Sequence, residues 1–412
     1  MSTTDREPSP LLRLYIAAGI TMAGISSVFA LFAELEQRYN LSTASIGWIA
    51  GTAFLSGLVT QLTLSRYADR GYATALLRAG LACAAVGLLW FAAATELWQF
   101  ICARSLLGAA VGMIIPAARR AVIISAHGNP GERLGTFYGS YLAGFVFGPP
   151  IAGLLTVLGD VRLPFLVFGV LTAVTGLSMA GIRLPEAPRT GRPSDRRDRR
   201  VIRRLLLDRR VFAALLVVVS FRYSIGVFEP LWAVHLDDLG ASTTLISFSL
   251  ASFALPMLIV ARQAGRLTDR VGARWSSLVA ALITVPMMAT YGYAGVVWII
   301  FAVAVPHGLM EAILSPGSQS AIAEASGERD AAAGQGLAEA GGSAAAAVGA
   351  FSAPALFDWL GAGPAWAIAA VAMLVLLSLS WWMDPPVRRR PGADVSDQVE
   401  PGAAQVEDLT RS

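Results

Sequence analysis

The sequence predicts an all-α membrane protein with twelve membrane-spanning helices in two six-helix, pseudo-symmetric halves. Composition is the first reason: 55% of the 412 residues are hydrophobic and only 15% are charged, whereas roughly 25% of the residues in soluble domains are charged. The second reason is a series of apolar runs, each close to the ~20 residues that cross ~30 Å of hydrocarbon. The third is an internal repeat, in which features of the first half recur 200 residues later.

The apolar runs are expected to be helices, because in lipid every backbone N–H and C=O must find its partner inside the segment. In the first half the runs cover about 11–33, 44–64, 73–95, 97–117, 135–158 and 163–182. In the second half they cover about 211–235, 243–263, 275–293, 296–318, 332–356 and 363–383.

These runs divide the chain into an N-terminal six-helix bundle within 1–182, a linker at 183–210, a C-terminal six-helix bundle at 211–383 and a disordered polar tail at 384–412. The linker contains eleven arginines and four acids. One interpretation is a contact with anionic lipid, in which the stretch VIRRLLLDRR lies on the membrane as a short amphipathic helix. The other, which we favour, is a solvated linker that follows the positive-inside bias.

The arginines predict the orientation of the chain in the membrane. One side has most of them, at Arg66, Arg70, Arg119, Arg120, Arg133, Arg266, Arg270, Arg274 and 388–390. The loops of the other side have only Arg38 and Arg162, among the acids Glu36, Asp160, Asp237, Asp238 and Asp358. We therefore expect a multi-pass protein of a bacterial inner membrane with both termini and the linker in the cytoplasm. No cleavable signal peptide is expected at the acid-containing N-terminus.

The repeat consists of equivalent residues at matching points of the span pattern. They are Asp69-Arg70 and Asp269-Arg270, Trp98 and Trp298, Gly108 and Gly308, and Pro116 and Pro316. Two six-helix halves of the same topology are a recognised transporter plan.

Three stretches contain recognisable patterns. The loop between the eighth and ninth runs reads GRLTDRVGAR. The equivalent loop of the first half, SRYADRGYAT, keeps only the pair Asp69 and Arg70 of that pattern, beside Ala68. The fourth run contains RSLLGAAVG, which begins at Arg104 and places glycines four and eight residues later. The fifth run contains GFVFGPPIAG at 144–153.

In these stretches the chain resembles the major facilitator superfamily, and the resemblance extends from Leu11 to Trp382. The first stretch is similar to the family's loop signature G-x-L-x-D-R-x-G-x-R, and the second to the R-x-x-x-G pattern of proton-coupled members. The third is similar to the G-x-x-x-G-P-x-x-G-G pattern of drug–proton antiporters, with Ala152 in place of one glycine. The resemblance implies gating roles for the matched residues, which are Gly144, Gly148, Pro149, Gly153, Gly265, Asp269, Arg270, Gly272, Asp69 and Arg70.

The fifth run also has a physical interpretation. Small residues four apart let two helices approach closely. A proline bends its helix and leaves one backbone carbonyl without a hydrogen bond, and neighbouring helices can supply a partner for that carbonyl. We expect this helix to lie close-packed at the interface of two halves that rock. The alternative is tight packing with no gating role.

Charged residues within the runs are candidates for function, because a charge at the bilayer centre costs at least ~2.5–3.5 kcal/mol. Each candidate also has a structural interpretation, as a hydrogen-bond anchor, a permanent ion pair or a direct substrate contact. The candidates for transport or proton coupling are Glu311, His307, Glu229, Arg222, Glu339 and Arg104. We rank Glu311 first, because His307 shares its helix face one turn away, and we treat Glu34 as a solvated residue of lower rank.

Aromatic residues beside Arg222 and Glu229 suggest a cavity for an amphipathic or aromatic solute. They are Tyr223, Phe228 and Trp232. For any one of them, ordinary packing in the core or against lipid is the simpler interpretation.

Other chemistries are not indicated. His127, His235 and His307 are too dispersed for a metal site, Cys83 and Cys102 lie in apolar spans as small core residues, and no phosphate-binding loop is present. We therefore expect no enzyme activity, cofactor, metal or nucleic-acid partner.

The sequence predicts a secondary transporter, working as a monomer among membrane lipids, that exports small organic molecules in exchange for protons by alternating access. One alternative is a proton-coupled importer or uniporter of a metabolite. An alternative from another class is a membrane receptor or lipid-handling protein that transports nothing.

Overall fold

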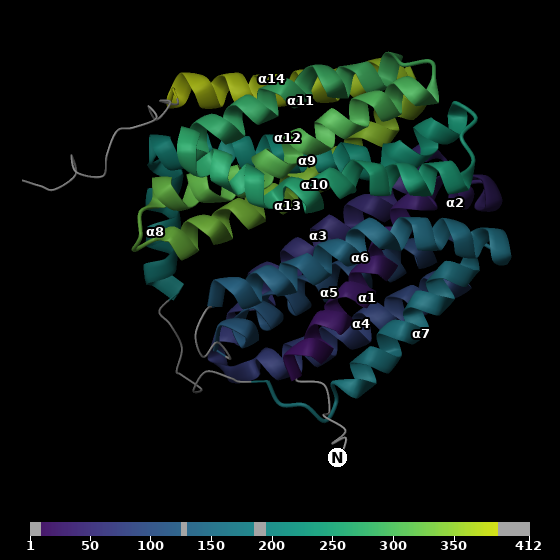
Figure 1. Ribbon diagram of the computed structural model, residues 1–412, viewed down its shortest axis with the longest axis horizontal. Helices are drawn as coiled ribbons and strands as arrows, with labels where there is room; N and C mark the ends of the chain where they lie inside the picture. Colours follow the sequence, from purple (N-terminus) through teal and green to yellow (C-terminus); the bar gives the residue numbers. More distant parts are fainter. Residues whose placement is uncertain (1–9, 125–129, 185–194, 386–412) are drawn as a thin grey trace, which may run out of the picture.

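The computed structural model describes residues 10–124, 130–184 and 195–385, and all regular structure within these ranges is helical (Figure 1). The tail expected to be disordered lies almost wholly outside them, as does the part of the linker at 185–194.

The first half of the chain forms seven α-helices and one short π-helical segment. They are α1 (Pro10–Ala30), α2 (Phe32–Tyr39), α3 (Thr43–Tyr67), η1 (Ala68–Tyr72), α4 (Ala73–Ala93), α5 (Leu97–Ile124), α6 (Pro130–Leu158) and α7 (Arg162–Ser178). The rest of the described chain forms α8 (Asp195–Leu207), α9 (Arg209–Asp238), α10 (Thr243–Val271), α11 (Ala273–Tyr293), α12 (Val297–Ser326), α13 (Ala331–Leu360) and α14 (Ala362–Met383).

Ten stretches of the described chain are long and apolar enough to cross a membrane. One of them, Thr43–Ala93, contains both α3 and α4, which η1 joins through Gly71 at φ +81°. The 17-residue α7 is apolar but shorter. Counting α3 and α4 separately and adding α7, the helices are consistent with the twelve predicted crossings.

Two features of the helices differ from the prediction. The first helix ends at Ala30 rather than near 33, and the chain continues after Leu31 as the separate helix α2. Several helices extend past their apolar runs, and α5 reaches Ile124 rather than 117. The reason for the longer helices is that regular backbone hydrogen bonding continues into polar sequence, whereas hydropathy identifies only the part that crosses hydrocarbon.

The repeat predicted from the sequence is present in the helices themselves. Four pairs of helices begin 200 residues apart: α3 and α10 at Thr43 and Thr243, α4 and α11 at Ala73 and Ala273, α5 and α12 at Leu97 and Val297, and α7 and α14 at Arg162 and Ala362. The starts of α3 and α10 are also capped alike, because Ser42 and Ser242 each accept a hydrogen bond from the backbone N–H three residues later.

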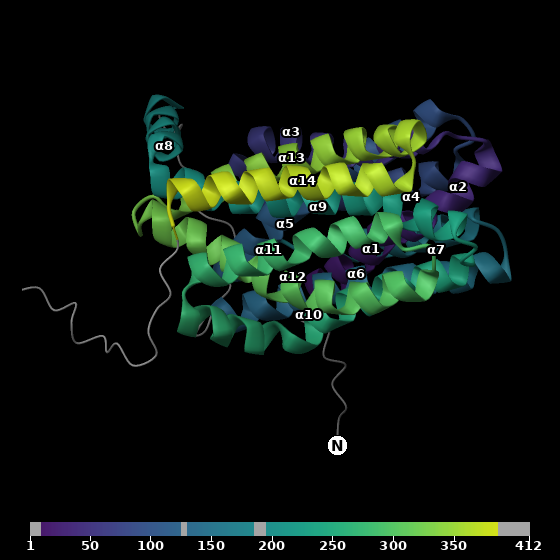
Figure 2. The ribbon, with the colours of Figure 1, turned by 90° about the horizontal axis from the view of Figure 1, so that it is seen from above.

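The helices pack as two halves, α1 to α7 and α9 to α14, which meet mainly where α3 packs on α13 and α6 packs on α10. The long helices run in roughly one direction, with α2 near one end of the molecule and α8 at the other (Figures 1 and 2). We call these the α2 end and the α8 end.

Candidate functional site

A buried ion pair joins the two halves in the interior. Arg104 of α5 donates from Nη2 to Oε1 of Glu229 on α9, and the two residues are only 2% and 7% exposed. Arg104 also donates to the backbone oxygen of Ile25 at 3.4 Å, and its guanidinium lies 4.9 Å from the ring centroid of Phe29. Because a buried charge is strongly destabilising without a partner, each of these two residues depends on the other half of the protein.

Further polar side chains lie near this pair on both halves. Arg222, two turns before Glu229 on α9, is within electrostatic range of it. Tyr141 of α6 is in turn within electrostatic range of Arg222 and of Glu339 on α13, and Glu339 accepts a hydrogen bond from Gln319 at 3.2 Å. Five of these residues form the set that we call the central polar array: Arg104, Glu229, Arg222, Tyr141 and Glu339.

His307 and Glu311 lie together, as their spacing predicts, but within the second half. His307 Nε2 is 3.6 Å from Glu311 Oε1, and its Nδ1 is 2.9 Å from the hydroxyl of Tyr291 on α11. Among the described residues, no hydrogen bond or ion pair connects Glu311 to Glu229. The sequence ranked Glu311 first because of its neighbour on the same helix face, whereas Glu229 is the acid that contacts the opposite half.

Two of the three candidate cavity aromatics pack in the interior of the second half. Trp232 is 2% exposed, donates from Nε1 to Ser249 Oγ at 2.8 Å, and stacks on Phe228 with ring centroids 4.4 Å apart. Phe228 also stacks on Phe253 at 4.8 Å. Tyr223 is half-buried on α9.

The glycines of α6 lie where two helices touch. A Cβ added at Gly144 or Gly148 would collide with backbone oxygens of α1, and one at Gly153 would lie 2.5 Å from Ser247 Oγ on α10. The first two glycines therefore fit α6 against its own half, and the third fits it against the other half. Pro149 is accommodated within the continuous helix.

Carboxylates and helix starts join the two halves at the α2 end. The backbone N–H of Ala44, at the start of α3, donates to Asp358 of α13 at 2.8 Å. Glu34 of α2 accepts a hydrogen bond from Thr243 at the start of α10, and Gln37 donates to Asp237. Glu34 is half-buried and bonded across the halves rather than freely solvated, which corrects the sequence-based expectation.

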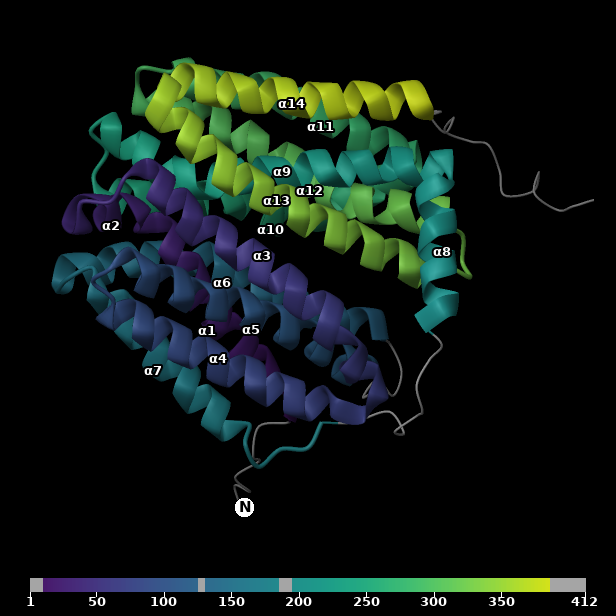
Figure 3. The same ribbon diagram turned by 180° about the vertical axis from the view of Figure 1, so that it is seen from behind.

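If α8 is counted with the second half, on which it packs, the ion pairs of the described residues at the α8 end stay within one half. Asp69 pairs with Arg120 at 3.3 Å, Arg204 with Asp330, and Arg274 with Asp384 at 3.8 Å. The ribbons of the two halves diverge toward this end (Figures 1 and 3).

The loop motif covers the end of α10 and the start of α11. Its charged pair is open to the surroundings, whereas Thr268 and Ala273 are buried. Asp269 and Arg270 are exposed. A Cβ at Gly265 would meet nothing within 4 Å, and Gly272 has φ +95°, a conformation that favours glycine.

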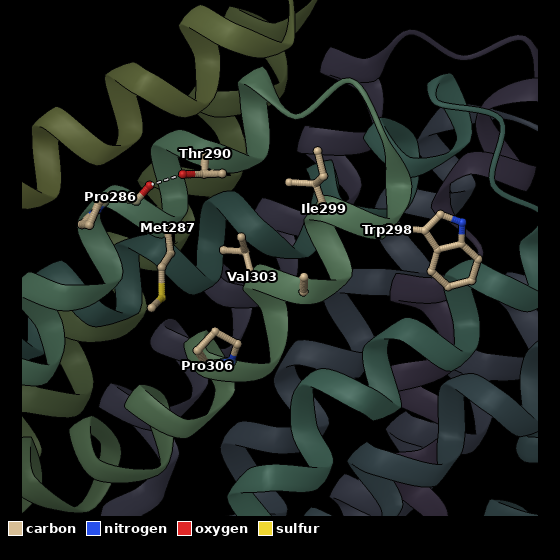
Figure 4. A pocket seen from close by; sticks show the side chains of 8 residues that line it. Pro286, Met287, Thr290, Trp298, Ile299, Val303 and Pro306 are labelled. Atoms are coloured by element: carbon tan, nitrogen blue, oxygen red, sulfur yellow. Dashed lines mark hydrogen bonds between the residues drawn. The ribbon is translucent and has the colours of Figure 1, made fainter.

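A separate apolar hollow of about 440 Å³ lies between α11 and α12, lined by Pro286, Met287, Val303 and Pro306 among others (Figure 4). No charged residue lines it. It is distinct from the central polar array and offers no group for proton coupling.

Comparisons with known proteins agree with this architecture. The family model of the Major Facilitator Superfamily matches residues 14–237 and 214–407. The uncharacterized MFS-type transporter YuxJ of Bacillus subtilis (strain 168) is 24% identical over 64% of this chain and 65% of its own length. The multidrug resistance protein MdtG of Enterobacter lignolyticus (strain SCF1) is 26% identical over 74% of this chain and 76% of its own.

Solved structures show the same fold. The nucleoside transporter NupG superposes with a TM-score of 0.75 at 12% identity, covering 91% of this chain and 99% of that one. A bacterial homolog of the human lysosomal transporter Spinster gives a TM-score of 0.75 at 12% identity, covering 92% and 98%.

Proposed function

The chain belongs to the major facilitator superfamily and is a membrane transporter, and we propose that it exports small organic molecules in exchange for protons. Export is supported by the similarity to proteins named multidrug resistance protein and by the glycine–proline pattern of α6. Proton coupling rests on one observation, the buried ion pair between Arg104 and Glu229. This pair joins the two halves that alternating access has to move.

In this proposal the α8 end is cytoplasmic. The arginines of α5 and α10, such as Arg119 and Arg266, lie there, whereas the acids Glu36, Asp237 and Asp358 lie at the α2 end. Both termini are then cytoplasmic, in the inner membrane of a bacterium. A tag placed after Ser412 is expected to be reached by antibody only in permeabilised cells.

The ion pair provides a simple exchange mechanism. Ionised Glu229 ties α9 to α5 through Arg104. A proton on Glu229 removes that charge, and Arg104 is left buried without its counter-ion, which costs several kcal/mol unless another group replaces it. The proton therefore loosens the tie between the halves, and it also removes the negative charge that would attract a cationic substrate. Because the proton and such a substrate compete for Glu229, they cross the membrane in opposite directions. Arg222 and Glu339 are the next charged groups of the array.

The proposal is tested with proteoliposomes that contain the purified transporter and an imposed pH gradient, with ethidium as a cationic probe of drug-like size. Wild type is expected to accumulate ethidium against its gradient and to move protons in the opposite direction. Glu229→Gln keeps the shape of the side chain and removes its titration. We expect this variant to bind ethidium, with an affinity that no longer depends on pH, and to lose gradient-driven accumulation.

Glu311→Gln is the matched comparison, because it removes the titration of a carboxylate that is buried within one half only. It is expected to retain gradient-driven transport. Transport at the wild-type rate in Glu229→Gln, with loss in Glu311→Gln, would assign the proton site to Glu311 instead. Ethidium-independent proton leak in wild type, with no accumulation of any cationic, neutral or sugar probe, would overturn proton-coupled export.

A further inference from the structure

The helix α8 lies across the α8 end of the molecule rather than along the bundle. It runs at a steep angle to the long helices (Figures 1 and 3), and seen from above it extends beyond the outline of α3 and α14 (Figure 2). In a bilayer whose normal follows the long helices, a helix in this position lies close to the plane of the lipid headgroups.

One side of α8 is fixed to the second half. Leu205 is 4% exposed within a cluster that includes Val211 of α9 and Ala338 of α13, and Val201 packs against the same cluster one turn earlier. Arg204 pairs with Asp330, the residue before the start of α13. These contacts set which sides of α8 remain free.

The free sides have two kinds of residue. Ile202 and Leu206, four residues apart and therefore on one flank, are both exposed, as is Leu207 at 76%. Arg200 and Arg203 are exposed on the remaining surface. An exposed apolar flank beside arginines is the pattern of a helix that lies in a membrane interface.

The start of α9 continues this surface. Arg209 and Arg210 are exposed, and the Arg209 guanidinium lies 5.6 Å from the ring centroid of Trp382 while donating to its backbone oxygen at 3.0 Å. Trp382 is 71% exposed at the end of α14. Tryptophan is enriched at the level of the headgroups, so its position places the nearby arginines at the same depth.

We propose that α8 and the first turn of α9 form a docking surface for anionic phospholipid headgroups. The exposed arginines Arg200, Arg203 and Arg210 contact the phosphates, and Ile202 and Leu206 enter the acyl region beneath them. Charge complementarity identifies the occupant, because arginines close to an anionic leaflet are attracted by its negative surface potential. This goes beyond the proposed transport function, and it adopts the lipid-contact interpretation of the linker, which the sequence alone did not favour.

The docking also has a structural consequence. Arg204 connects α8 to Asp330, and α13, which starts at the next residue, packs on α3 of the first half. A lipid that holds α8 therefore holds the α8 end of a helix that contacts both halves.

The first test measures retention of phosphatidylglycerol and of phosphatidylcholine by the full-length protein in native mass spectrometry. The variant Arg200→Gln/Arg203→Gln/Arg210→Gln leaves the paired Arg204 and Arg209 unchanged. The control Arg119→Gln/Arg262→Gln/Arg266→Gln removes three exposed arginines from α5 and α10. Wild type and control are expected to prefer phosphatidylglycerol, and the α8 variant is expected to lose affinity for it at least about tenfold. Equal losses in both variants, or no loss in the α8 variant, would overturn the proposal.

The second test measures the depth of the helix and does not depend on the charge variants. A nitroxide is attached at Leu206→Cys in a Cys83→Ser/Cys102→Ser background, in nanodiscs of phosphatidylglycerol or of phosphatidylcholine alone. In phosphatidylglycerol, the label is expected to be more accessible to oxygen than to a water-soluble nickel reagent. In phosphatidylcholine, its accessibility to oxygen is expected to be lower than in phosphatidylglycerol. A label that remains fully water-accessible in both lipids would contradict the docked helix.

Discussion

The two ends of the molecule are stabilised by different contacts. At the α2 end, polar contacts cross between the halves, as in the pairs Ala44–Asp358 and Glu34–Thr243. At the α8 end, the ion pairs of the described residues, such as Arg120–Asp69, join helices of the same half. Under the proposed alternating access, the contacts that hold the α2 end closed have to break in each cycle, whereas the α8 end can rearrange without losing them. The structure is the state closed at the α2 end.

The chemistry of the α2 end explains why this closure is reversible. A helix N-terminus attracts negative charge through its free N–H groups, with a strength of typically 0.3–1 kcal/mol, and Asp358 occupies that position on α3. A small number of such contacts stabilises one state by a few kcal/mol, which a substrate or proton can offset. Substitutions at either end can therefore show whether the two ends differ in this way.

The largest effect is expected from a side chain placed in the seam between the halves. A Cβ at Gly47 would lie 2.7 Å from the backbone oxygen of Ala350 and 2.9 Å from Pro354, so Gly47→Leu prevents the approach of α3 to α13. We expect transport to decrease more than about tenfold, and a reporter at Thr52→Cys to be labelled more rapidly from the α2 side. The control is Gly139→Leu on α6, where nothing lies within 4 Å of the added Cβ. If the two variants transport equally well, the seam does not control closure.

A smaller effect is expected from Asp358→Asn, which keeps the size of the side chain and removes its charge from the start of α3. Loss of a charged group at a helix N-terminus costs about 1 kcal/mol, so the population open at the α2 end is expected to rise about fivefold. Cysteine labelling at Thr52→Cys measures that population. Asp69→Asn breaks an ion pair inside one half, and it is expected not to increase the rate of this labelling. Faster labelling in Asp69→Asn would remove the distinction between the ends.

Asp269 of the loop motif is expected to act in the opposite state. Its side chain is exposed in the present structure and makes no hydrogen bond or ion pair with another described residue. We expect its partner to be an arginine or the N–H groups of a helix end on the cytoplasmic side, and we infer that this partner comes within reach only when the α8 end closes. Asp269→Asn is expected to shift the balance a few-fold toward the present state, by about 1 kcal/mol or less, without abolishing ligand binding. Unchanged labelling of cavity cysteines from both sides would exclude this role.

The sequence predicted the helices and their repeat, because hydropathy and local spacing determine them. Gly144 and Gly148 were also identified correctly as positions of close helix packing, since residues four apart share one face of any helix. The pairing of Arg104 with Glu229 was not predicted, although both residues were candidates. They are 125 positions apart, and their contact depends on how two helices from different halves lie against each other.

Two other features were given too little weight for a related reason. Glu34 lies at the end of an apolar run, and hydropathy alone predicts that such a residue is solvated. Its partial burial is explained by the hydrogen bond that it accepts from Thr243 at the start of α10. The helix α8 has a weak apolar face, and its packing depends on a single buried leucine, Leu205, and the neighbouring Val201. The local sequence pattern identifies such a segment as a candidate helix, and its tertiary contacts determine whether the helix forms and where it packs.

The smallest effect concerns the pH at the α2 end. Glu36 lies in α2, outside the membrane-spanning helices, and accepts a hydrogen bond from Thr43 at 2.8 Å. Burial raises the pKa of this carboxyl to about 7, with further contributions from the nearby Asp238, Asp358 and Asp237, while the bond from Thr43 opposes the shift. When the α2 end opens, the three aspartates of the second half move away and water returns, so the pKa of Glu36 falls back toward its ordinary value near 4.5.

The sign of the pH effect follows from this difference. The proton binds more tightly when the α2 end is closed, so protonation favours closure. That contribution is fully present below about pH 4.5 and is lost as the pH rises through about 7. Because Glu36 is only partly buried, solvent screens much of this linkage. Labelling at Thr52→Cys from the α2 side is therefore expected to increase a few-fold between pH 5 and pH 8, after correction for the thiolate fraction with the same reagent on a free thiol. Glu36→Gln is expected to remove the increase and to keep labelling low, because the amide resembles the protonated acid. Glu96→Gln, which changes an exposed acid at the start of α5 near the same end, is expected to keep the wild-type profile. If Glu36→Gln retained that profile, the pH response would have to come from another acid of the α2 end.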